Sequence, residues 1–164
     1  MKKNFLLSVL VVLFSAGTVF AQEFGAYADF AIPTKENAKS LVGIGLDFKF
    51  EITDGFNAGA LVGYRNALTS DYNYFQIPFM GLARYYVNRG EDGFYPQIAL
   101  GGMYNHTSVT VLGQKVKSSS TNFAMDFGVG YKISEFADLS VHFENVFYKN
   151  INENYVLIRY SYSF

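Results

Sequence analysis

Two small groups of residues have the types and spacing that protein chemistry uses. His106 and Ser108 are separated by one residue, and a hydrolase pairs such a base with such a nucleophile. His142 and Glu144 are also two apart, so in a strand both would point to one face and could ligate a metal ion. However, the next acidic residue after Ser108 is Asp126, and the spacing shows no third metal ligand for the second pair. We therefore predict no catalytic, cofactor-binding or metal site and no enzymatic activity.

The elements that would position these residues are eight stretches in which apolar and polar residues alternate. The second is the clearest, because Phe48 and Phe50 fall on one face while Asp47, Lys49 and Glu51 fall on the other. Alternation with a period of two predicts β-strands that present one apolar face. The stretches span residues 24–32, 42–52, 56–65, 74–87, 94–105, 122–132, 137–144 and 155–164.

Every charged residue within these stretches falls on the face opposite to the apolar one. The apolar face carries more long aromatic side chains than a small barrel can enclose, and many of them lie near strand ends, as in interfacial girdles. The apolar face is therefore predicted to meet lipid, and the charges, together with His142, to line a lumen. The charged residues are Asp29, Asp47, Lys49, Glu51, Arg65, Arg84, Asp126, Lys132, Asp138, Glu144 and Arg159.

The positive and negative charges of the predicted lumen nearly cancel, because five of its residues are basic and six are acidic. An eight-stranded barrel is barely wide enough for its own side chains, so we expect ion pairs that fill it. A polar conduit is the alternative, because inward-facing glycines could leave a cavity; they are Gly43, Gly45, Gly59, Gly63, Gly101, Gly128 and Gly130.

The predicted fold is all-β, an eight-stranded antiparallel up-and-down transmembrane β-barrel. Lipid tolerates no unpaired strand edge, so the first strand should pair with the last. The Asp54-Gly55 pair predicts a tight hairpin, and short turns of this kind alternate with longer external loops. We expect residues 106–120, which are rich in serine, to form the longest and most mobile loop. The loop lysines would suit the phosphates of lipopolysaccharide; they are Lys35, Lys39, Lys115, Lys117 and Lys149.

The N-terminus predicts export. Lys2 and Lys3 precede an apolar run from Phe5 to Phe14, and Ala21 offers a cleavage site, so residues 1–21 are predicted to be a cleaved signal peptide. Residues 22–164 then form one barrel domain. Removal of two of the 13 basic residues and none of the 14 acidic ones leaves a net charge of −3, which gives no support for a nucleic-acid partner. The chain has no cysteine and therefore no disulfide or thiolate metal site.

Three segments carry a resemblance to a known family: Tyr74-Phe75-Gln76-Ile77-Pro78, Phe94-Tyr95-Pro96 and the terminal Tyr160-Ser161-Tyr162-Ser163-Phe164. They resemble the small porin-family outer-membrane β-barrel proteins, OmpX-like or OmpW-like, that are common in Bacteroidetes. The resemblance covers residues 22–164. It implies a bacterial outer-membrane location, contact with outer-membrane lipid and lipopolysaccharide, and a C-terminal signal for the barrel assembly machinery in Tyr160, Tyr162 and Phe164.

The resemblance is specific for architecture and not for activity, since such families include structural proteins, channels and adhesins. The His106-x-Ser108 spacing is also similar to that of the outer-membrane lipid A deacylases. Those enzymes carry a glutamate about a dozen residues after the serine, where this chain has Ser120. We expect a monomer with a structural or cell-surface interaction role. A narrow porin-like channel or solute-binding site is the alternative, and a lipid A-modifying hydrolase the remote one.

Overall fold

The computed structural model describes residues 22–36, 38–69, 73–88, 93–111, 114–149 and 152–164. The predicted signal peptide, residues 1–21, lies outside these ranges. The described residues contain no helix of the length and apolarity needed to cross a membrane. They form eight strands: β1 (Gln22–Pro33), β2 (Leu41–Thr53), β3 (Phe56–Ala67), β4 (Asn73–Tyr85), β5 (Gly93–Val111), β6 (Gln114–Lys132), β7 (Ala137–Phe147) and β8 (Asn152–Ser163).

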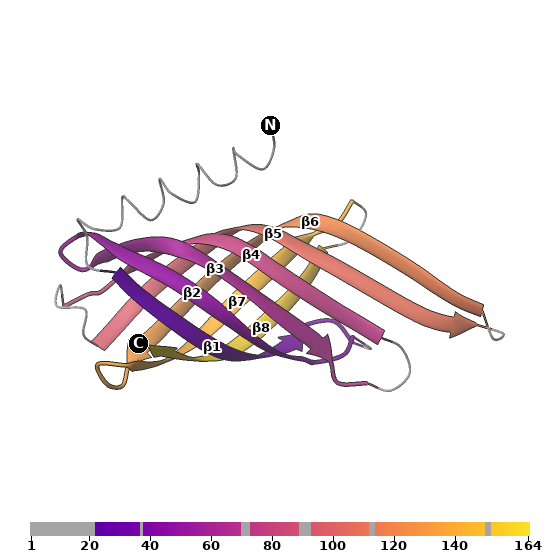
Figure 1. Cartoon of the computed structure of the whole chain (residues 1–164), viewed down its shortest axis with the longest axis horizontal. Coiled ribbons are helices and arrows are strands. Elements are labelled where there is room, and N and C mark those ends of the chain that lie inside the picture. Colours follow the sequence, from indigo (N-terminus) through magenta and orange to yellow (C-terminus); the bar gives the residue numbers. More distant parts are fainter. Residues whose placement is uncertain (1–21, 37, 70–72, 89–92, 112–113, 150–151) are drawn as a thin grey trace.

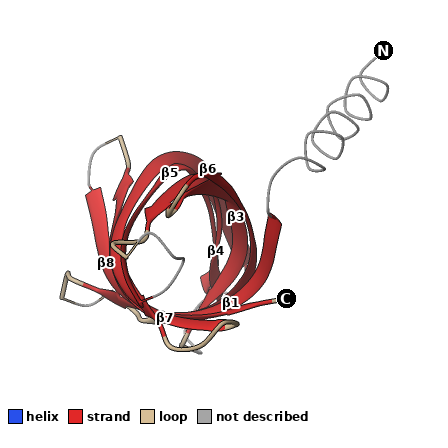
Figure 2. Cartoon of the chain, turned by 90° about the vertical axis from the view of Figure 1, so that its left-hand side faces the viewer, coloured by secondary structure: helices blue, strands red, loops and turns tan. Residues whose placement is uncertain are grey.

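The strands close into an antiparallel barrel. Each strand pairs with the next, and β1 pairs with β8 from Gly25 opposite Ser163 to Pro33 opposite Tyr155. Figure 2 shows the closed ring nearly end-on. The predicted all-β fold and the predicted closure of first strand on last are confirmed.

The barrel is apolar outside and polar inside, the reverse of a water-soluble barrel. On the outer face Ile44 is 69% exposed and Phe127 47% exposed, whereas Arg65 and Glu144 inside are 1% and 0% exposed. The alternation of side chains across each strand produces this division, because neighbouring residues point to opposite faces of a sheet. Outward apolar side chains of this kind are what a lipid-facing surface needs.

Two tight turns, at residues 54–55 and 133–136, join strands at the end of the barrel where β1 begins and β8 ends (Figure 1). The β2–β3 hairpin turns at Asp54 and Gly55, as predicted, and Gly55 has a φ of 77° that a glycine adopts without steric strain. The register shifts between Glu51 and Thr53, just before the turn. Gly93 also has a positive φ, 76°, where β5 begins.

The expectation of a long mobile loop at residues 106–120 is wrong. β5 and β6 are 19 residues each and stay paired from Gly93 opposite Lys132 to Val111 opposite Gln114. We call residues 106–111 and 114–120 the β5–β6 ribbon. Residues 106–108 still pair with β4, and beyond them β5 and β6 run well past the other strands in Figure 1. The serines suggested a loop, but the β-branched residues between them favour extended backbone. In addition, β5 and β6 pair with each other along the ribbon, so the backbone N–H and C=O groups on their facing edges are hydrogen-bonded.

Candidate functional site

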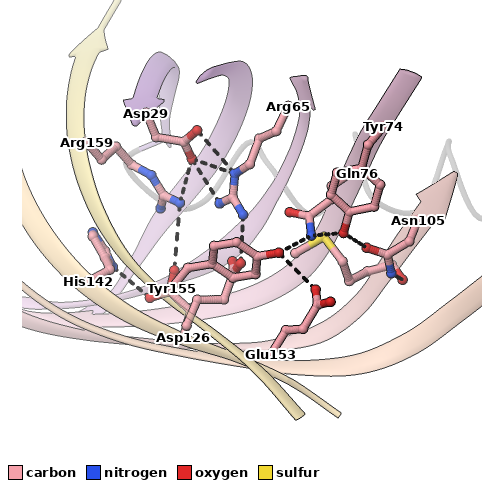
Figure 3. A network of polar contacts seen from close by, with 12 residues as sticks. Asp29, Arg65, Tyr74, Gln76, Asn105, Asp126, His142, Glu153, Tyr155 and Arg159 are labelled. Carbon is pink, nitrogen blue, oxygen red and sulfur yellow. Dashed lines mark hydrogen bonds and ion pairs between the residues drawn. The ribbon is translucent and has the colours of Figure 1, made fainter. Parts of the chain in front are cut away.

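The centre of the lumen holds a network of ion pairs across four strands. The Arg65 guanidinium donates to both neighbours: Nη2 lies 2.9 Å from Asp29 Oδ2, and Nη1 lies 2.7 Å from Glu144 Oε1. Arg159 Nη2 lies 3.3 Å from Asp29 Oδ2. Figure 3 shows Arg65 and Arg159 meeting at Asp29. All four side chains are buried, so each charge is stabilised by its partners rather than by bulk water.

The same network extends to the histidine of the lumen. His142 Nδ1 lies 2.6 Å from Asp126 Oδ1, and its Nε2 lies 2.8 Å from Ser140 Oγ. Arg159 Nη2 lies 3.7 Å from Asp126 Oδ2. His142 and Glu144 therefore take different partners although they share a strand face. The described part of the chain contains no group of three or more histidine, aspartate or glutamate side chains placed to hold a metal ion.

A second network lies toward the end of the barrel with the tight turns. Arg84 Nη1 lies 3.2 Å from Asp138 Oδ2, and the guanidinium sits over the ring of Tyr95, 3.8 Å from its centroid. The Tyr95 hydroxyl donates to Asp138, and Arg84 also donates to the Tyr86 hydroxyl at 3.0 Å. Lys132 is half-buried and lies 5.8 Å from the Tyr86 ring centroid. Cation–π contacts and ion pairs thus act together here.

A third group surrounds Lys49. Its ammonium is fully buried and lies 3.2 Å from Asp47 Oδ1 and 3.4 Å from Glu23 Oε1. Glu51 does not share this arrangement: its carboxylate accepts a hydrogen bond from the backbone N–H of Gly55 at 3.3 Å and so supports the hairpin turn. The twelve residues predicted for one lumen network therefore divide into three groups, with Glu51 at the turn.

Other atoms of the barrel occupy the space beside the inward glycines, where the sequence allowed a cavity. Large lumen side chains lie directly opposite glycines of neighbouring strands, and a Cβ at those glycines would overlap their rings. The pairs are Tyr27 with Gly45, Tyr95 with Gly130, and His142 with Gly128. The sequence prediction missed Tyr27 and Tyr95. An aromatic residue on the polar face, paired with a glycine across the strand, was the signal that could have found them.

An apolar layer lines the lumen on the ribbon side of the central network. Its members are fully or almost fully buried and belong to one hydrophobic cluster with Leu41 and Met103. Each lies two residues from a member of the central network along its own strand, on the side of the ribbon: Ala31 beside Asp29, Ala67 beside Arg65, Val146 beside Glu144, and Leu157 beside Arg159. An ion that moved along the lumen would therefore have to pass through close-packed apolar side chains.

A network of uncharged groups and one carboxylate follows beyond the apolar layer. The Tyr74 hydroxyl donates to Asn105 Oδ1 at 3.1 Å, and Gln76 Nε2 donates to the hydroxyls of Tyr74 at 2.8 Å and Tyr155 at 3.3 Å. Tyr155 in turn donates to Glu153 Oε2 at 2.9 Å (Figure 3). The sequence prediction missed this group as well, because it followed charges and not tyrosines.

Just outside the strands, Tyr148 joins the same group. Burial, together with the neighbouring Tyr74 and Glu153, raises the pKa of its phenol. A phenol is protonated at neutral pH, and the raised pKa keeps this hydroxyl protonated further into the alkaline range.

His106 and Ser108 have the spacing of a hydrolase pair, but His106 takes another partner. His106 points outward, its ring stacks on Phe75 with centroids 4.9 Å apart, and Nδ1 lies 2.8 Å from Ser119 Oγ and not from Ser108. At the other end of the barrel, the predicted assembly signal is also on the outer face: Tyr160, Tyr162 and Phe164 are all exposed.

No protein-family model matches the sequence, and no curated protein matches it significantly. Solved structures do match. The attachment invasion locus protein Ail of Yersinia pestis superposes with a TM-score of 0.65 and 12% identity over 88% of this chain and 97% of its own. The N-terminal β-barrel domain of Pseudomonas aeruginosa OprF gives 0.63 and 12% over 88% and 99%. The outer-membrane enzyme PagL gives 0.59 and 17% over 84% and 98%.

These identities are too low to carry an activity from one chain to another, and one of the three structures is an enzyme. What they share with this chain is the fold of a small eight-stranded bacterial outer-membrane β-barrel. That fold is consistent with the predicted outer-membrane location.

Proposed function

We propose that this chain is an outer-membrane protein whose barrel is a sealed, structural support and whose β5–β6 ribbon contacts other molecules at the cell surface. The observation that carries the proposal is the open edge of the ribbon. β6 pairs with β7 only from Phe123 opposite Phe147, so residues 114–122 pair with β5 alone. Side chains 114–121 are all exposed.

An open strand edge is suited to binding an extended segment of another protein. Its unpaired N–H and C=O groups can accept a further strand, with the main chain providing affinity. The described barrel strands below the ribbon pair on both edges, so they offer no equivalent edge. We therefore propose an extended segment of another surface protein as the partner of the ribbon.

The lumen supports a structural rather than a conducting role. Three groups of paired charges, an apolar layer and a tyrosine network follow each other along it, and side chains occupy the space beside the glycines. A narrow channel for small solutes is the second candidate, because the charged side chains would select ions if a continuous path of water ran along the lumen. The packing favours the sealed state, and the conductance measurement at the end of the Discussion distinguishes the two.

The outer face of the barrel and its last strand would each contact partners in the outer membrane. Outer-membrane lipid and lipopolysaccharide would surround the apolar outer face, and the barrel assembly machinery would read Tyr160, Tyr162 and Phe164. We propose a monomer, because the closed barrel leaves no strand edge within the membrane to be covered.

We propose no lipid A-modifying hydrolase activity. His106 contacts Ser119, but within the described residues no carboxylate is hydrogen-bonded to this histidine to orient it. A base without such support would be a weak activator of a serine hydroxyl.

The ribbon can be removed without touching the barrel. Replacing residues 109–116 by an Asn-Gly turn joins Ser108 to Lys117, which are paired opposite each other, and keeps every pairing of β5 with β4. Bacteria that display the full chain should adhere to intact cells and lose that adhesion when protease removes the surface proteins of those cells. Bacteria with the shortened ribbon should not adhere, although the barrel stays folded. The control variant carries Lys39→Gln and Lys149→Gln, two exposed external lysines outside the ribbon. Equal adhesion by all three strains would contradict the proposal.

A further inference from the structure

The outer face of β4, β5 and β6 changes chemistry over three successive cross-strand rows. The first row is apolar and aromatic, with Ile77 opposite Tyr104. The second places Phe75, His106 and Ser119 side by side. The third ends in Lys117, which pairs with Ser108. Apolar contacts thus give way to an imidazole and a hydroxyl, and then to an ammonium, along one continuous surface.

The spacing of these rows matches the boundary of a bilayer. Adjacent rows are two residues apart, or about 6.6 Å along a strand, which a tilt of about 40° reduces to roughly 5 Å along the membrane normal. The headgroup layer on each side of the hydrocarbon core is roughly 5–8 Å thick. The rings of Tyr64, Phe75 and Tyr104 pack together, with neighbouring centroids 5.4 and 6.2 Å apart. Aromatic belts of this kind mark the membrane interface, so His106 and Ser119 fall at headgroup level.

We propose that His106, Ser119 and Lys117 bind the terminal phosphate monoester of an anionic lipid headgroup in the outer leaflet. The site is held in position from two sides: stacking on Phe75 and the 2.8 Å contact with Ser119 orient the imidazole. The described residues give the His106 Nε2 no hydrogen-bond partner and give Lys117 no carboxylate within ion-pair distance. The ammonium can donate a charge-assisted hydrogen bond to a phosphate oxygen. When the Ser119 hydroxyl donates to His106 Nδ1, the N–H at Nε2 can donate a second hydrogen bond to the phosphate.

The lipid rather than a free anion is the ligand because the apolar row continues directly below the polar one. A headgroup phosphate bound at Lys117 brings its acyl chains against Tyr104 and Ile77, which a soluble phosphate cannot use. The lysine stem can also lie along this surface while its ammonium reaches the phosphate.

This inference rests on the proposed membrane location, so the test separates the two. The mature chain is refolded into bilayers of phosphatidylcholine with a minor fraction of phosphatidic acid, and the lipids retained by the folded barrel are counted by native mass spectrometry. A heat-dependent shift on gels reports folding independently. A barrel that fails to insert would contradict the membrane proposal. An inserted barrel that retains phosphatidic acid no better than phosphatidylcholine would overturn the headgroup site alone.

We expect Lys117→Gln to lower retention of phosphatidic acid about tenfold. A tenfold change in affinity corresponds to the loss of about 1.4 kcal/mol, which we assign to the charge-assisted contact of this lysine. Lys149→Gln, an exposed external lysine away from these rows, serves as the matched control and should leave retention unchanged. Equal losses in both variants would mean general attraction to a basic rim and would overturn a defined site. Inorganic phosphate at millimolar concentration should not displace the lipid, and full displacement would show that a soluble anion is the ligand.

Discussion

Arg65 of β3 reaches across the lumen to Glu144 of β7 and also binds Asp29 of β1. The stability of the interior depends on such residues. The guanidinium is 1% exposed, and its planar fork matches two carboxylates at once. Removing it leaves Asp29 and Glu144 buried without their main partner, which costs more than the ion pairs themselves contribute.

We expect Arg65→Met to lower the free energy of unfolding by about 3–5 kcal/mol. Urea titration of the chain folded into lipid vesicles measures this change. The double variant that adds Glu144→Gln should recover part of the loss, because Glu144 then carries no unpaired buried charge while Asp29 keeps Arg159 as its partner. Lys115→Met, an exposed lysine of the ribbon, should change stability by no more than about 0.5 kcal/mol. A loss below about 1 kcal/mol for Arg65→Met would show that water reaches the lumen freely.

A pair of glycines tests the packing of the lumen at the same scale. A Cβ at Gly59 would overlap the Phe48 carbonyl, which is backbone and cannot move aside, whereas a Cβ at Gly81 meets its nearest atoms at 3.9 Å. Gly59→Ala should therefore destabilise the barrel by about 1–3 kcal/mol, the cost typical of overpacking. Gly81→Ala should be neutral in the same urea titration. Equal tolerance of both substitutions would contradict the close approach of β2 and β3.

At the scale of the element, alternation predicted which face of every strand points to lipid. The apolar residues of all eight stretches lie on the outer face. Neighbouring side chains point to opposite faces, so once the charged residues are assigned to the interior the apolar residues between them must point outward. The ribbon could not be predicted in the same way. Ser118, Ser119 and Ser120 are compatible with loop or strand, and the pairing with β5 depends on a partner that a local pattern does not contain.

Strand parity predicts a contrast between two arginine substitutions. Ile44 is the most exposed aliphatic side chain on the outer face of β2, and Ile44→Arg should cost about 2–4 kcal/mol if the residue lies near the bilayer centre. Val116 is also exposed, but it belongs to the ribbon, where Val116→Arg meets water and should cost at most about 0.5 kcal/mol. Unfolding in lipid vesicles compares them. A negligible cost at Ile44 would contradict the lipid-facing assignment.

At the scale of the whole molecule, the sequence predicted the barrel well and its interior only in part. The lumen charges were found because charged residues on one strand face stand out in any sequence. Their division into three groups was not, since it depends on which residues of distant strands share a level of the barrel, as Arg65 of β3 and Glu144 of β7 do. The tyrosine network was not predicted for the same reason. The similarity to Ail, OprF and PagL shows the fold and not an activity.

The sealed lumen is tested most directly by conductance. The mature chain is inserted into planar bilayers, with a gel shift and protection from protease confirming insertion in the same preparation. The packed ion pairs and the apolar layer of Ala31, Ala67, Val146 and Leu157 predict no steady openings. Steady openings whose conductance changes with Arg84→Ala or Glu144→Gln would contradict the structural role and establish a channel instead.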